Sequence, residues 1–149
     1  LYDKFIENKR IILTRIHTVI DNSNSYLSAV LDLLQNIILS EPEEINNLSR
    51  IEKQRLTESL SKSLTNSDEV VRISAAELLF KIDSETALLF IDSMISDENF
   101  WNRMRLLDMF IDLDNSIIIE ALDKLANDPE EMVSEKAKEL ALRKQYLTN

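Results

Sequence analysis

The chain has 149 residues, of which 17 are basic and 27 acidic, giving a net charge of −10. It lacks cysteine, which excludes disulfides and cysteine-based zinc sites, and it lacks glycine, which argues against tight hairpins and phosphate-binding loops. Nucleic-acid binders need lysine and arginine for the phosphates, so the acidic balance argues against a nucleic-acid partner. No apolar run approaches the roughly 18 residues of a membrane span. We therefore expect an all-α, soluble, cytoplasmic protein without membrane contact.

Residues 1–21 are expected to form the first helix, because apolar side chains recur at helical spacing. The predicted stripe is built from Tyr2, Phe5, Ile12, Ile16 and Val19, and widened by Ile6, Leu13 and Ile20. Turn-favouring residues at 22–25 end this helix, and a second helix reaches about Ser40 before Glu41-Pro42 stops it. Residues 43–49 are expected to be a connector with a short helical turn. The wide apolar stripe makes the first two helices a candidate homodimer contact.

A 31-residue self-similarity runs from about residue 50 to residue 147. Residues that are 31 positions apart have matching chemistry. Two apolar sets are Leu56, Ala87 and Ile118, and Leu60, Ile91 and Leu122; one polar set is Asn66, Asp97 and Asp128. A fixed period of this length is typical of stacked supersecondary units. We predict three helix pairs, at 50–65 with 68–82, 85–96 with 98–113, and 116–127 with 129–147. Asp128 is the expected N-cap of the last helix, with Pro129 at its first position.

The repeat register predicts one continuous core. Its expected members are Leu60, Leu64, Leu79, Phe80, Ile91, Ile95, Phe110, Ile111, Leu122, Leu140 and Leu142. In the last repeat, Glu135, Lys138 and Lys144 replace apolar residues of the earlier repeats. Terminal repeats need a polar outer face, so the array is expected to end there.

The stretch 64–79 resembles a HEAT repeat, because Asp68 is followed by Val71-Arg72, by Ala75-Ala76 and then by leucines. The short period is most similar to the HEAT-like repeats first associated with phycobilisome lyases. This resemblance covers residues 50–147. It implies a right-handed α-solenoid of roughly eight helices in a single domain, 1–149, with residues 1–40 as an irregular N-terminal pair.

In this family the second helix of each pair lines the concave side, which implies a partner-binding surface there. Positions at i, i+4, i+7 and i+11 form one stripe on each second helix. The candidate partner-binding residues are Glu77, Lys81, Trp101, Arg105, Asp108, Asp112, Met132, Glu139 and Arg143. Trp101 is the only tryptophan and the candidate anchor, because tryptophan is enriched among interface hot spots.

No catalytic motif, cofactor motif or metal-ligand set was recognised. His17 is the only histidine and is expected to be structural, and Asp108 with Asp112 supplies too few oxygens for a hard metal. We therefore expect a non-enzymatic module that binds another protein through an acidic concave face. One alternative is an immunity or inhibitor protein covering a basic active site, because residues 83–131 hold thirteen acids against three bases. Another is an accessory subunit of a lyase-type enzyme.

Overall fold

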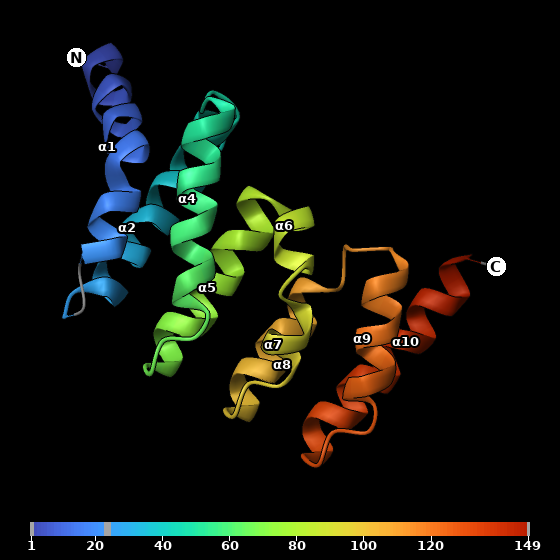
Figure 1. Cartoon of the computed structure of the whole chain (residues 1–149). Helices are drawn as coiled ribbons and strands as arrows, with labels where there is room; N and C mark the ends of the chain where they lie inside the picture. Colours follow the sequence, from blue (N-terminus) through green and yellow to red (C-terminus); the bar gives the residue numbers. More distant parts are fainter. Residues whose placement is uncertain (1, 23–24, 149) are drawn as a thin grey trace. The chain divides into compact units, whose positions relative to one another are not determined.

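The computed structural model describes the backbone of residues 2–22 and 25–148, and side chains within 8–22 and 25–145. These residues form helices and no strands, so the all-α prediction is confirmed for them. The chain divides into two compact units, residues 1–86 and 87–149 (Figure 1). The helices are α1 (Tyr2–Asn22), α2 (Leu27–Ser40), α3 (Glu43–Asn46), α4 (Arg50–Ser63), α5 (Glu69–Ile82), α6 (Ser84–Leu88), α7 (Ile91–Ile95), α8 (Phe100–Met109), α9 (Ser116–Leu125) and α10 (Glu131–Thr148).

The described residues thus form ten helices, two more than the sequence predicted. One is the connector turn at 43–46. The other arises because the helix expected at 85–96 is broken into α6 and α7. At the break, the Phe90 N–H donates to the Ala87 carbonyl at 3.0 Å, which is the tighter i to i+3 spacing of a 3₁₀ turn. Leu89 is left 81% exposed at this turn.

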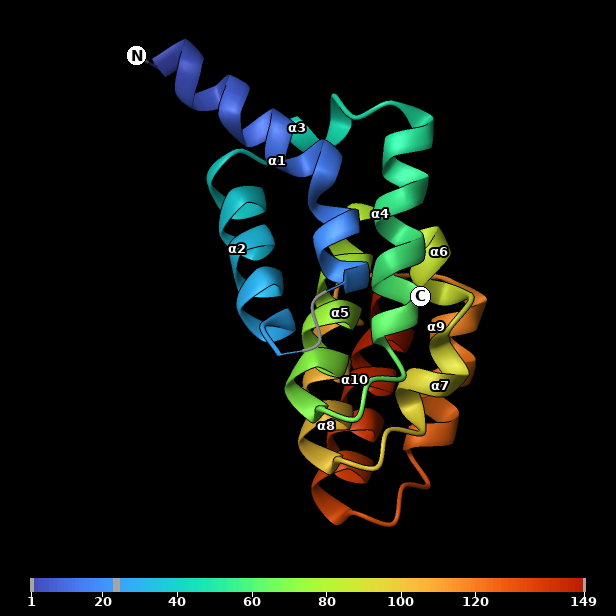
Figure 2. The same cartoon turned by 60° about the vertical axis from the view of Figure 1, so that its left-hand side comes forward.

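The first unit contains two packed helix pairs, shown from a second side in Figure 2. Helix α1 packs on α2 and α4, and α5 packs on α2 and α4. The first helices of the two pairs are therefore in contact, and so are the second helices. Their common core contains Leu13, Ile16, Ile20, Leu31, Leu34, Leu56, Leu60, Leu78 and Leu79.

The predicted stripe of α1 was partly wrong. Leu13, Ile16 and Ile20 are buried, whereas Ile12 and Val19 are 38% and 45% exposed. Ile12 and Val19 lie at one edge of the apolar stripe, and the sequence pattern did not fix which edge faces the core. The side chains of residues 1–7, including the predicted stripe members Tyr2, Phe5 and Ile6, lie outside the described part.

The second unit repeats this packing order. Helix α7 packs on α8 and α9, and α10 packs on α8 and α9. Phe110 is fully buried, and Ile91, Ile95, Leu122 and Leu140 are also in the core. Two predicted core residues, Ile111 and Leu142, are instead 51% and 53% exposed. Ile111 follows the end of α8, and Leu142 lies on a face of α10 that no described helix covers.

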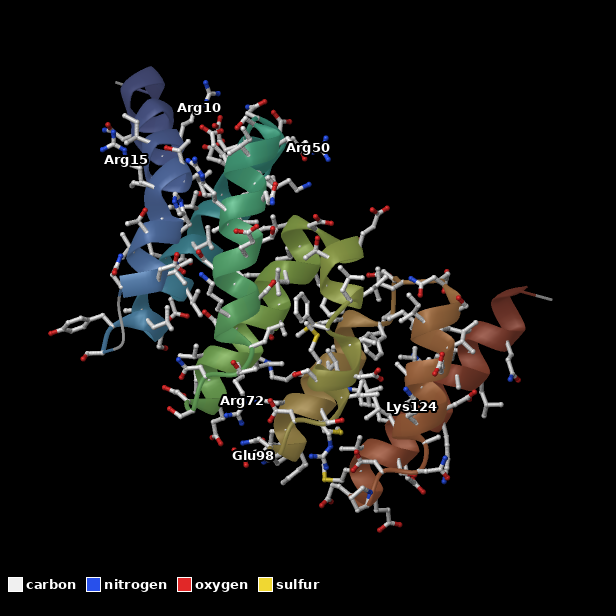
Figure 3. The ribbon with its side chains drawn as sticks, viewed as in Figure 1. Arg10, Arg15, Arg50, Arg72, Glu98 and Lys124 are labelled. Carbon is white, nitrogen blue, oxygen red and sulfur yellow. The ribbon has the colours of Figure 1, made fainter. Side chains whose placement is uncertain are left out.

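The turns between paired helices share one local structure at the 31-residue period. Asn66, Asp97 and Asp128 each accept, through a side-chain oxygen, the backbone N–H two residues ahead, at 2.8–2.9 Å. Arg72 and Arg103, at equivalent positions, donate from Nη1 to the carbonyls of Asn66 and Asp97, at 3.0 and 2.6 Å. Arg72 is labelled in Figure 3. The repeat thus has an atomic counterpart in its turns.

Two terminal features differ from the sequence predictions. Helix α10 begins at Glu131, so Asp128 and Pro129 precede it, and Asp128 is not its N-cap. Lys144 is only 8% exposed, and its ammonium donates to the carbonyls of Ile111 and Leu113 and to the Asp114 carboxylate. It therefore satisfies backbone groups where α8 ends, whereas an exposed charge on a polar outer face was expected.

Candidate functional site

The residues that the sequence singled out in the second unit lie mainly on α8 and α10. We call the surface formed by Trp101, Arg105, Asp108, Met132, Lys136, Glu139 and Arg143 the α8–α10 face. Trp101 and Met132 occupy the same repeat position and are 55% and 48% exposed. Exposing the large apolar surface of a tryptophan to water is energetically unfavourable, so the exposure of Trp101 is the most unusual feature of this face.

The position of Trp101 is set by the start of α8. Asn99 is the N-cap, and its Oδ1 accepts the backbone N–H groups of Trp101 and Asn102 at 2.8 and 3.4 Å. The indole therefore belongs to the first helical turn and has a fixed backbone anchor. Its ring lies 4.6 Å from the Phe100 ring between centroids, at an interplanar angle of 35°. This neighbour limits the orientations open to the indole.

The charges of the α8–α10 face are largely paired with one another. Lys136 Nζ donates to Asp108 Oδ1 at 2.6 Å and to the Met104 carbonyl at 3.2 Å. Arg143 Nη2 donates to Glu139 Oε1 at 2.7 Å. Both pairs are solvent-exposed, and such pairs contribute about 0–1 kcal/mol each to stability. Pairing reduces the negative potential that Asp108 and Glu139 can offer to a partner.

An apolar depression lies beneath these pairs, between α8 and α10. It is lined by Leu107, Ile111 and Leu140, together with the four charged residues Asp108, Lys136, Glu139 and Arg143. The face thus has two parts: an aromatic and thioether end at Trp101 and Met132, and a depression with a charged rim. Such a combination can bind a protein side chain by apolar contact and orient it by charge.

Three predicted site residues do not belong to α8 or α10. Asp112 follows the end of α8, which Phe110 closes, so it is not part of the helical stripe. Glu77 and Lys81 lie on α5 of the first unit, where Glu77 is half-buried and Lys81 exposed. The structure therefore brings Asp108, Glu139 and Arg143 together around one depression, and it places Trp101, Arg105 and Met132 on the same two helices. It adds Lys136, which sits one turn after Met132 in the same sequence stripe, and Ile111, which the core prediction had misassigned.

A buried ion pair of the second unit lies at the turn before α10. Arg103 donates from Nε and Nη2 to the Asp128 carboxylate at 2.7 and 2.9 Å, and both side chains are buried. Burial alone would raise the pKa of Asp128, but hydrogen bonds from Arg103 and from the Glu130 N–H outweigh it and lower that pKa below its ordinary value. This pair fixes the start of α10, and hence Met132.

His17 is half-buried on α1, and its Nε2 lies 3.3 Å from Thr18 Oγ1. Among the described side chains, no three carboxylates or histidines gather as a metal site would require. Within the same part of the chain, no helix has the length and apolarity needed to cross a bilayer.

The comparisons with known proteins gave no match to a family model, to a curated protein or to a solved structure.

Proposed function

We propose that this chain is a non-enzymatic helical-repeat module of the HEAT type that binds another protein through the α8–α10 face. The 31-residue recurrence of the turns supports the repeat assignment. In each unit, first helices pack on first helices and second helices on second helices, as in a right-handed α-solenoid. The single observation that carries the function is the exposure of Trp101 on a helix surface that its own unit leaves uncovered.

The physical reason for this proposal is that exposing the Trp101 indole to water is energetically unfavourable and burying it in a complex is favourable. A buried tryptophan contributes strongly to binding, and truncation of a hot-spot tryptophan costs about 2 kcal/mol or more. Here Asn99 fixes the backbone of Trp101 and Phe100 limits its ring, so little conformational entropy remains to be lost on binding. Met132 extends the same apolar surface with an adaptable thioether. We propose Trp101 as the anchor, Met132 as its neighbour and Arg105 as a polar contact.

The test compares wild-type protein with two matched variants, Trp101→Ala and Tyr26→Ala. Tyr26 is 75% exposed on the first unit and serves as the aromatic control. Each protein is immobilised and exposed to lysate of the source cells, and captured proteins are identified by mass spectrometry. We expect a partner retained by wild type and Tyr26→Ala but weakened at least about 30-fold by Trp101→Ala. Equal retention by all three folded proteins would place the binding surface elsewhere.

An inhibitor of a basic protein is the second candidate, and the charge of the second unit favours it. Residues 87–149 hold thirteen acidic and seven basic side chains. A complex of this kind would associate quickly at low salt, and its association rate would fall steeply as salt rises. A partner whose association rate is insensitive to salt would favour the general module over the inhibitor.

A further inference from the structure

A groove between α9 and α10 lies outside the proposed binding surface. It is lined by Asp114, Asn115, Ser116, Ile119, Leu122, Asp123, Ala141, Lys144 and Gln145. Ile119 is 54% exposed, and Leu142, on α10, is 53% exposed. The neighbouring helix α7 lies on the other side of α9, where Lys124 of α9 pairs with Asp92 at 2.8 Å. The groove is therefore the side of α9 that a further helix pair would cover in a stack.

The register of the repeat supports this reading of the groove. Ala141 is the counterpart of Phe110, and Leu122 is the counterpart of Ile91. Phe110 and Ile91 are both buried within the second unit, where the α9–α10 pair covers them. In the last repeat the equivalent surface has no described helix over it. It therefore keeps an apolar floor suited to another helix.

The first unit presents a matching surface on α1. Buried Leu13, Ile16 and Ile20 face the unit's interior, and a row of exposed residues runs along the flank of the helix beside them. We call this side the α1 outer stripe, which consists of Ile11, Ile12, Arg15 and Val19. The three apolar members are 38–48% exposed. Figure 3 shows Arg15 on the side of α1 opposite α4.

The two surfaces are complementary in charge as well as in apolar character. Arg15 is exposed on the stripe, and Asp123 is exposed on the groove rim. Neither forms an ion pair within the described side chains. Lys144 is the base that lines the groove, and its ammonium already donates hydrogen bonds to the Asp114 carboxylate and to two backbone carbonyls. A helix with aliphatic side chains around one arginine therefore fits this groove, and α1 is such a helix.

We propose that the α9–α10 groove binds the α1 outer stripe of a second copy of this chain, in a head-to-tail contact. The contact extends the packing rule of both units, with α1 of one copy on α9 of the next and α2 on α10. Arg15 would then face Asp123, and Leu33 of α2 would lie near Leu142. Such a heterologous contact leaves one free surface of each kind on every pair, so the chain associates stepwise with concentration. It differs from the homodimer contact between N-terminal helices that the sequence suggested.

The test blocks each surface separately with Ile119→Asp and Val19→Asp, both at exposed positions. Sedimentation velocity over a range of concentrations should show wild-type self-association and two monomeric variants. An equimolar mixture of the variants retains one intact groove and one intact stripe, so it should form a 1:1 heterodimer and no larger species. Leu89→Asp, at an exposed turn, is the matched control and should associate as wild type does. Circular dichroism establishes that every variant is folded.

The charge pair gives a second, independent arm. Arg15→Asp and Asp123→Arg should each weaken association by about tenfold or more, because like charges then face each other. The double variant carries the reversed pair and should regain association. A monomeric wild type at every concentration would overturn the proposal, and binding of a basic amphipathic peptide by that monomer would assign the groove to a different protein. Dimerisation of Ile119→Asp alone would overturn it in favour of a symmetric contact.

Discussion

The stability of the second unit should depend on Arg103 far more than on Arg143. Both arginines approach a carboxylate at 2.7 Å, Arg103 with Asp128 and Arg143 with Glu139. The exposed fractions differ greatly, at 11% and 5% for the first pair and 68% and 65% for the second. The stability losses caused by Arg103→Met and Arg143→Met therefore show the effect of burial for two ion pairs with the same contact distance.

The expected magnitudes follow from that burial. Removing one partner of a buried ion pair leaves an uncompensated charge and costs about 3–5 kcal/mol. Arg103→Met also removes the donor to the Asp97 carbonyl. An exposed pair is screened by water, so Arg143→Met should cost no more than about 1 kcal/mol. Asp128→Asn in the Arg103→Met background removes the orphaned charge, and should recover part of the loss.

The assay can observe the second unit alone, because Trp101 is the only tryptophan of the chain. Urea unfolding followed by tryptophan fluorescence reports this unit, and far-ultraviolet circular dichroism reports the helices of both. The free-energy change is taken from the shift of the midpoint at constant slope. Similar midpoint shifts for Arg103→Met and Arg143→Met, or no recovery with Asp128→Asn, would refute the reasoning from burial.

Three further outcomes are expected. Leu79→Ala and Phe110→Ala each remove a fully buried side chain, and each should cost about 2–5 kcal/mol of unfolding free energy in a thermal or urea melt. The Asp128 carboxyl has a lowered pKa in the folded state, so its contribution to stability is present above the unfolded pKa of about 3.9 and is lost as pH falls through the folded pKa. Acid titration followed by Trp101 fluorescence should show this loss in wild type and a smaller one in Arg103→Met, and identical acid profiles would contradict it. Lys144→Met leaves two carbonyls without their charged donor and should cost about 2–3 kcal/mol, whereas a wild-type melting curve would mean that water replaces the ammonium.

Most helices could be predicted from the sequence because their apolar spacing and end signals agree. The structure places α2 at Leu27–Ser40 and α4 at Arg50–Ser63, close to the predicted bounds. The break between α6 and α7 carries no such signal. No proline or glycine marks it, and one tightened turn changes the spacing of Ala87 and Ile91 too little to be seen in the pattern.

The candidate site was predicted in part. The repeat period placed Trp101, Asp108 and Glu139 correctly on the faces of α8 and α10, because equivalent positions recur every 31 residues. Their pairing with Lys136 and Arg143 follows from side-chain geometry that spacing alone does not give. Ile111 and Leu142 share one repeat column, and Ile111 directly follows the buried Phe110. A neighbouring position on a helix is turned by about 100°, which decides between core and solvent.

The recurring turn has a consequence for how the chain folds. The turn is closed by a hydrogen bond between a side-chain oxygen and the backbone N–H two residues ahead, and the turns of Arg72 and Arg103 are also closed by the arginine, which reaches back six residues. Every one of these contacts is short in sequence, so forming the turn costs little loop-closure entropy. No residue of the described backbone has a positive φ, so the turn also needs no glycine and adds none to the flexibility of the unfolded chain. Each turn can therefore form on its own, before any contact between distant parts of the chain exists.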